Sequence, residues 1–266
     1  MRHWSRRRGL FFKSEARRLP DLGTSILLFV AGCASWIIGI FSGGGGSIVL
    51  LAVITNLIRV KTIAPVITIA SLMAGPTRIL VSWRLIEWAV VRWYLPGAIT
   101  GAIVGSWFFT WANAAWLRLI VGLFLVSMPI QYRLGAQARS FPMRLPWFIP
   151  VSVAVGVISG VIGASSLVSA PFYLNYGLTK ERMIATGAVH SIFIQITKIA
   201  TYGSLGVLSS GSILEGVAAG WGAIVAILVT RQWLDSFKEL WFRRLAILLM
   251  LISGLSMLWR SRGLLF

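Results

Sequence analysis

The stretch Gly39-Ile40-Phe41-Ser42-Gly43-Gly44-Gly45-Gly46-Ser47 interrupts a chain that is strongly apolar on both sides of it. Four consecutive glycines oppose a regular helix, because each glycine costs about 1 kcal/mol relative to alanine. This first interruption begins at Gly39. A second interruption runs from Gly156 to Ser166. Non-helical backbone at membrane depth is tolerated only inside protein or beside a watery cavity, so both breaks are candidate substrate-contacting segments.

The apolar stretches around these breaks predict a membrane protein. The chain is 57% hydrophobic and only 12% charged, with a mean hydropathy of +0.83, which leaves too little polar surface for a soluble globule. Stretches long enough to span or half span a bilayer lie at about 23–41, 46–58, 63–83, 94–112, 115–132, 146–163, 165–176, 183–205, 212–231 and 241–259. We therefore expect an all-α polytopic integral membrane protein with about eight crossings and a glycine-broken or re-entrant segment in each half.

The two halves repeat one pattern. Gly39-x-x-Ser42-Gly43 matches Gly156-x-x-Ser159-Gly160, and the segment 71–79 lies over 191–199. The predicted division is a basic cytoplasmic N-terminal tail (1–21), a first transmembrane repeat (22–132), a polar linker (133–145), a second transmembrane repeat (146–259) and a basic C-terminal end (260–266). Counting Lys and Arg by loop slightly favours parallel repeats with the N-terminus, linker and C-terminus cytoplasmic, and inverted repeats stay open.

The charge balance fits a multi-pass protein of the plasma (inner) membrane. Twenty-five Lys and Arg against seven Asp and Glu give a net charge of +18. Such a charge in a soluble chain would suggest nucleic acid, but basic loops beside apolar spans are typical of cytoplasmic faces near anionic lipid. Residues 1–20 also imitate a cleavable signal, although the apolar run after them is longer than such signals have. Expected partners are membrane lipids and a small anionic substrate, with a homo-oligomer left open and nucleic acid excluded.

Two cations stand apart from the rest, because Arg78 and Lys198 fall well inside apolar stretches and at matching points of the two repeats. A cation at the centre of a spanning helix costs about 2.5–3.5 kcal/mol, so it usually faces a cavity or a partner. No Asp or Glu lies well inside a span, and an anionic substrate would supply the missing counter-charge. The competing interpretation is that both side chains snorkel to the membrane interface.

Other polar residues of the breaks and of the third apolar unit in each repeat complete the candidate binding site. Helices that begin at about Ser47 and Ser165 would present free N–H groups to an oxyanion, whereas the alternative role of the glycines is close helix packing. His190, Ser191, Gln195 and Lys198 form one polar stripe; His190 could relay protons or simply pack, and Asn56 could contact a ligand or cap a helix. The full set of candidate substrate-binding residues is Gly43, Gly44, Gly45, Gly46, Ser47, Asn56, Ser71, Thr77, Arg78, Gly160, Gly163, Ser165, His190, Ser191, Gln195, Thr197 and Lys198.

These patterns resemble the TauE/SafE sulfite exporter-like family. The resemblance lies in Gly39-Ile-Phe-Ser-Gly43-Gly-Gly-Gly46, in the Pro96-Gly97-Ala98-x-x-Gly101-Ala102-x-x-Gly105 run, and in Gly156-x-x-Ser159-Gly160-x-x-Gly163 with Pro171. It extends from about residue 22 to 259. The resemblance implies a polytopic permease for small sulfur-containing anions, such as sulfite or sulfoacetate, or for related organic anions. The second break holds fewer glycines than the first, and the arginine-rich tail is not typical of the family.

The expected function is therefore secondary transport of a small anion, outward across the plasma membrane, because a negative interior favours the exit of negative charge. No zinc-protease, nucleophile-elbow or nucleotide-binding motif is present in the sequence, so we expect neither an enzyme nor a cofactor or metal. The alternative is a membrane-embedded anchoring or assembly subunit that transports nothing. A membrane enzyme ranks third, because those motifs are missing.

Overall fold

The structure is a computed structural model that describes residues 21–41, 45–136, 141–164, 168–230 and 239–261. All regular structure in these ranges is helical. The helices are α2 (Leu22–Phe41), α3 (Gly46–Ile54), α4 (Val60–Ser82), η1 (Trp83–Leu85), α5 (Trp88–Trp111), α6 (Ala114–Ala136), η2 (Leu145–Trp147), α7 (Phe148–Ile162), α8 (Ala170–Tyr176), α9 (Lys180–Ser204), α10 (Ser210–Thr230) and α11 (Glu239–Ser261).

The prediction of an all-helical membrane protein is confirmed. Each apolar stretch corresponds to one helix, and α2 and α7 end at the two predicted breaks. In the part of the chain that the structure describes, six segments are long and apolar enough to cross a membrane, namely Leu22–Phe41, Val60–Leu80, Leu145–Ile162, Glu181–Ser204, Ser210–Thr230 and Arg244–Ser261. Helix α6 continues to Ala136, so its end falls in the range assigned to the linker.

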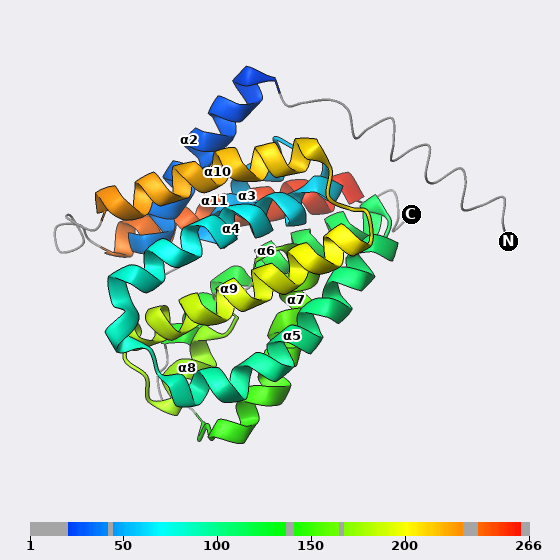
Figure 1. Ribbon diagram of the computed structural model, residues 1–266. Helices are drawn as coiled ribbons and strands as arrows, with labels where there is room; N and C mark the ends of the chain where they lie inside the picture. Colours follow the sequence, from blue (N-terminus) through cyan, green and yellow to red (C-terminus); the bar gives the residue numbers. More distant parts are fainter. Residues whose placement is uncertain (1–20, 42–44, 137–140, 165–167, 231–238, 262–266) are drawn as a thin grey trace, which may run out of the picture.

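Two long helices, α4 and α9, lie side by side and run in opposite directions (Figure 1). Gly75, near the end of α4, packs on Ile192 in the middle of α9, whereas Ala64, near the start of α4, packs on Gly163 beside Lys198. Helix α10 packs on α4, and α5 packs on α9. Helix α2 covers α10, α7 covers α5, and α6 pairs with α11. These contacts place α4 and α9 between the remaining helices.

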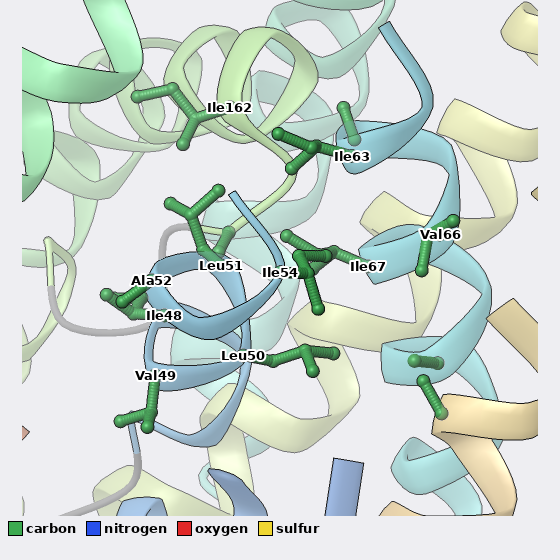
Figure 2. Close-up of a cluster of buried hydrophobic side chains, with 14 of the residues drawn as sticks. Ile48, Val49, Leu50, Leu51, Ala52, Ile54, Ile63, Val66, Ile67 and Ile162 are labelled. Carbon is green, nitrogen blue, oxygen red and sulfur yellow. The ribbon is translucent and has the colours of Figure 1, made fainter. Parts of the chain in front are cut away.

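The short helix α3 is buried inside this bundle. Ile48, Val49, Leu50, Leu51, Ala52 and Ile54 have no exposed surface, and they pack against α4 and against Ile162 of α7 (Figure 2). Protein therefore surrounds α3 almost completely, and lipid does not. Helix α2 needs glycine where it meets the start of α3, because a Cβ on Gly39 would lie 2.2 Å from the Cα of Gly46.

The predicted packing role of the paired glycines is also confirmed. Cβ atoms on Gly97, Gly101 and Gly105 of α5 would each lie 2.2–2.3 Å from a main-chain or side-chain oxygen of α7. Gly156 and Gly160 of α7 make the same close approach to the backbone of α5. Small residues allow such backbone contact between membrane helices, which gains dispersion energy without a hydrophobic driving force. The α5–α7 pair is thus held rigidly beside α9.

Large apolar side chains cover much of the outer surface. Trp107 of α5, Leu228 and Val229 of α10, and Leu248 and Ile252 of α11 are each more than half exposed. Exposed apolar surface on this scale is unusual for a soluble protein and is what a lipid-facing surface requires.

Candidate functional site

A cavity of about 70 Å³ lies among helices α2, α4, α5, α7, α8 and α9. The two helices at the centre of the bundle, α4 and α9, supply Ser71, Arg78, His190, Ser191 and Gln195 to its polar lining. Ser47, in the first turn of α3, and Ser169, the residue before α8, also line the cavity. The cavity is therefore bordered by the segments that follow both predicted breaks.

Six of the residues selected from the sequence line this cavity. They come from three helices and from both halves of the chain: Ser47, Ser71, Arg78, His190, Ser191 and Gln195. The spacing of His190, Ser191 and Gln195 places them on one side of α9, and all three line the cavity. The sequence pattern thus selected residues that are far apart in the chain and that the fold brings together.

The other selected residues lie elsewhere. Gly45 and Gly46 form the buried start of α3 beside Ser47, while Gly160 packs on α5. Asn56 is exposed and accepts a hydrogen bond from Ser256, and Thr197 bonds back to its own helix. Outside the cavity lining are Gly45, Gly46, Asn56, Thr77, Gly160, Gly163, Thr197 and Lys198. Gly43, Gly44 and Ser165 fall outside the described residues.

Lys198 is completely buried and lies next to the cavity without lining it. Its ammonium donates to Gln195 Oε1 at 2.9 Å, to the carbonyl oxygen of Gly163 at 3.0 Å and to Ser159 Oγ at 3.4 Å. Three acceptors match the three donors of an ammonium group. The side chain therefore does not snorkel to an interface. It ties α9 to the carboxyl end of α7, where helix carbonyls favour a cation.

The lysine also orients a residue that does line the cavity. Because an ammonium only donates, Gln195 must offer its carbonyl oxygen to Lys198. The amide NH₂ of Gln195 then points away from Lys198, as a donor on the cavity side. Gly163, which supplies another acceptor, has a φ of +96°, a backbone conformation that favours glycine.

An aromatic cluster forms another wall of the cavity. The ring of His190 stacks on Tyr94 at a centroid distance of 4.0 Å, with only 9° between the planes. The hydroxyl of Tyr173 lies 2.5 Å from His190 Nδ1, and Phe148 packs against both tyrosines. Only 2% of His190 is exposed. The imidazole is therefore held in one orientation by contacts on its face and on its edge.

Among the described residues, three side chains that line the cavity contain a buried polar atom without a hydrogen-bond partner. They are Trp36 Nε1, Ser71 Oγ and His190 Nε2. Trp36, Tyr94 and Tyr173 were not selected from the sequence. A signal for Trp36 existed, because it precedes Gly39 by three residues and so shares the helix face that meets the break. Its ring packs on Gly46, where a Cβ would lie 3.1 Å away.

The charge around the cavity is positive. Arg78 lines it, Lys198 lies behind Gln195, and the lining residues that the structure describes include no Asp or Glu. Within the described ranges, no ion pair joins Arg78 to a carboxylate. A small cavity with a guanidinium group, several N–H and O–H donors and no carboxylate is suited to an anion.

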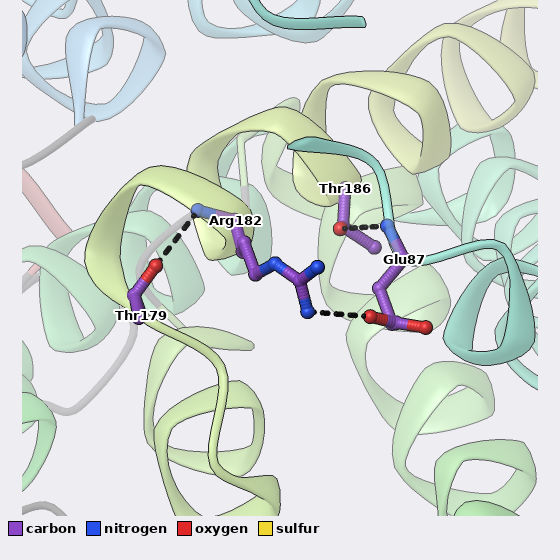
Figure 3. Close-up of polar contacts among 4 residues, drawn as sticks. All are labelled: Glu87, Thr179, Arg182 and Thr186. Carbon is purple, nitrogen blue, oxygen red and sulfur yellow. Dashed lines mark hydrogen bonds and ion pairs between the residues drawn. The ribbon is translucent and has the colours of Figure 1, made fainter. Parts of the chain in front are cut away.

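Contacts at the start of α9 hold one end of this site in place. Arg182 Nη1 lies 2.9 Å from Glu87 Oε2, and the backbone N–H of Glu87 donates to Thr186 Oγ1 at 3.0 Å (Figure 3). Thr179 caps α9 by accepting from the backbone N–H of Arg182. The next residue, Met183, lines the cavity. These bonds join the beginnings of α5 and α9. Further along the same two helices, Tyr94 of α5 stacks on His190 of α9.

Comparison with known proteins gives one match. The sequence profile of the sulfite exporter TauE/SafE family matches residues 27–257, which is most of the chain. The chain belongs to this family. No curated protein and no solved structure matches it.

Membership in the TauE/SafE family agrees with the apolar helices. The family is one of membrane transporters, and the chain is accordingly a multi-pass membrane protein of a transporter family. The matched range begins in α2 and ends in α11, so it contains every helix that borders the cavity.

Proposed function

We propose that this protein is a secondary permease that moves a small anion, sulfite or another sulfur-containing or organic anion, outward across the plasma membrane. The anion would bind in the cavity between α4 and α9. It would be held by Arg78 and by the hydrogen-bond donors of Ser47, Ser71, Ser191 and Gln195. This function involves no catalysis and no cofactor.

The cavity and its charge carry the proposal. Arg78 lines a cavity with no carboxylate among its described lining residues, which therefore bring no negative charge to the site. Burying a cation without compensation is costly, and an anionic substrate would supply the counter-charge. Lys198 would add positive potential through Gln195 without touching the substrate. The sulfite part of the proposal rests on the family description.

The membrane potential would supply the driving force. With a negative interior, outward movement of each negative charge is favoured by about 2.3 kcal/mol per 100 mV. No coupling cation is then required, which agrees with the lack of carboxylates around the cavity. We further place the N-terminus on the cytoplasmic side, because basic residues dominate positions 1–20.

We also propose that the chain consists of two inverted repeats with eight crossing helices. The short helices α3 and α8 would return the chain within each repeat, because four crossings per repeat alone would give parallel repeats. If α2–α6 are equivalent to α7–α11 in order, each contact in the structure should have an equivalent contact. The α2–α10 contact corresponds to the α7–α5 contact, the α4–α10 contact corresponds to the α9–α5 contact, and all four occur. Helices α4 and α9, which would be equivalent, run in opposite directions, as an axis in the membrane plane requires. This direction favours inverted repeats over parallel ones. With α5 and α6, which are 24 and 23 residues long, the apolar helices give eight crossings.

The equivalent cations of these repeats have different surroundings. Arg78 faces the cavity, whereas Lys198 is bound to the end of α7. In alternating access, inverted repeats exchange their conformations. Under this proposal the opposite state would release Lys198 to the cavity and bind Arg78 near the end of α2.

The rival proposal is an anchoring or assembly subunit without transport. Close helix packing through Gly97, Gly101 and Gly105 would serve either function. A buried cavity with polar groups that lack partners has no use in an anchor, and this observation favours the permease. Saturable anion binding by a purified monomer would count against the anchor.

Flux through purified protein in liposomes tests the proposal. We expect sulfite efflux that increases with an inside-negative potential, and we expect Arg78→Gln to abolish it. The matched control is Arg84→Gln, because Arg84 is exposed and lies over the ring of Trp83, 5.4 Å from its centroid. Flux that persists in Arg78→Gln at the parent rate would remove Arg78 from the site. Flux that ignores the potential would remove the driving force given above.

A further inference from the structure

We propose that Trp36, Ser71 and His190 form a set of neutral donors that binds the oxygen atoms of one oxyanion group, and that Tyr173 positions His190 for this task. The inference rests on the proposed anion permease and specifies how its cavity recognises the ligand. The three side chains come from α2, α4 and α9, so one ligand would bridge three helices.

Trp36 and Ser71 are donors that the protein leaves unused. The indole nitrogen of Trp36 can only donate, and its side chain is 2% exposed. Ser71 is 6% exposed, and its Oγ makes no hydrogen bond, although a helical serine can bond to a carbonyl one turn back. Unpaired buried donors of this kind cost about 1–3 kcal/mol each. An acceptor in the cavity would remove that cost.

The tautomer of His190 follows from its contact with Tyr173. A neutral imidazole has one donor and one acceptor nitrogen, and the phenol hydroxyl donates well to an acceptor nitrogen. Under this proposal Tyr173 is the donor in this contact, which places the proton of His190 on Nε2, the atom that has no partner. Stacking on Tyr94 then fixes the direction of this N–H. Tyr173 is therefore a positioning residue.

All of these groups present hydrogen atoms to the cavity. The amide NH₂ of Gln195, oriented by Lys198, does the same. A site with these donors and the guanidinium group of Arg78 favours a ligand whose recognised end consists of acceptors. Sulfite and sulfonate groups meet this condition, because each has three acceptor oxygens and no N–H. An ammonium ligand would be rejected.

Affinity for sulfite and for methanesulfonate, measured by titration calorimetry on the purified full chain, tests this set. Trp36→Phe and Ser71→Ala remove one donor each, while the first keeps an aromatic ring and the second keeps the Cβ. Because a hydrogen bond to a charged group is worth about 1.5–3 kcal/mol, we expect each to raise Kd at least about tenfold. The controls Trp221→Phe and Ser204→Ala lie on exposed surface and should leave Kd unchanged.

The effect of Tyr173→Phe on Kd, compared between the parent and His190→Gln, distinguishes positioning of the His190 proton from a merely structural role. We expect it to raise Kd about tenfold in the parent, because the proton is then free to move to Nδ1. In His190→Gln the amide nitrogen replaces Nε2 as a donor without a tautomer, so the same change should raise Kd less than about twofold there. Equal losses in both backgrounds would show that Tyr173 does not act through the tautomer.

The outcomes separate this inference from the function beneath it. If the parent binds and transports sulfite but Trp36→Phe and Ser71→Ala bind it within about twofold of the parent, the donor set is wrong and the permease stands. If the parent neither binds nor transports either anion, the proposed function fails, and this inference fails with it. A thermal unfolding transition like that of the parent shows that each variant is folded.

Discussion

Adding one methyl group to Gly101 should force α5 and α7 apart. In Gly101→Ala the new Cβ would lie 2.2 Å from the carbonyl oxygen of Val153. An ordinary contact between carbon and oxygen is about 3.3 Å, so the helices must separate by about 1 Å at this point. Overpacking of this size costs about 1–3 kcal/mol, and separation would also weaken the neighbouring contacts of Gly97 and Gly105.

The same substitution elsewhere should have the opposite sign. In Gly203→Ala on α9, the nearest atom to the new Cβ is Leu208 Cδ1 at 3.7 Å, which is an ordinary contact. Alanine in a helix is favoured over glycine by about 0.5–1 kcal/mol, so this variant should be slightly stabilised. Thermal unfolding in one detergent compares the two, with about 2–4 °C expected per kcal/mol. Equal shifts, or a stable Gly101→Ala, would refute the close α5–α7 contact.

Three further outcomes follow from the contacts of the site. Arg182→Gln should lower stability by less than about 1 kcal/mol, since both members of its ion pair with Glu87 are partly exposed, and the loss should shrink at high salt in chemical unfolding. Gly163→Ala should cost about 1–2 kcal/mol, because its φ is +96°, and a loss of sulfite affinity in calorimetry should accompany it as the carbonyl moves from Lys198. Arg78→Lys should keep more liposome flux than Arg78→Gln, because it retains the charge and loses only the planar fork; equal flux would mean that charge is irrelevant there.

The positions of the helices could be predicted because each depends on local composition. The apolar stretches match α2 to α11, and the glycine run ends α2 where predicted. The paired small residues on α5 also predicted a close helix contact, which Gly97, Gly101 and Gly105 make with α7. These features follow from periodicity and from the absence of a side chain, and both are visible in a single sequence.

Which residues meet in the cavity could be predicted only in part. The matching positions of Ser71 and Ser191 in the two repeats selected two residues that do line it. Thr77 and Thr197 match equally well in the sequence and do not line it. The direction of these two side chains depends on the orientation of α4 and α9 about their own axes. Packing against partners elsewhere in the chain determines that orientation. Trp36 and Tyr173 were missed for the same reason, since aromatic residues in apolar stretches more often contact lipid.

Arg78 and Lys198 show most clearly what a sequence pattern leaves undecided. Both were expected to clamp the substrate, because a buried cation needs a partner and no carboxylate was near. Lys198 instead finds three neutral acceptors, two of them on α7, which a search for counter-charges does not consider. Hydrogen bonds of this kind satisfy the donors and leave the net charge in place. The positive potential of Lys198 therefore still reaches the cavity, and an anion there would be stabilised by a lysine that it does not touch.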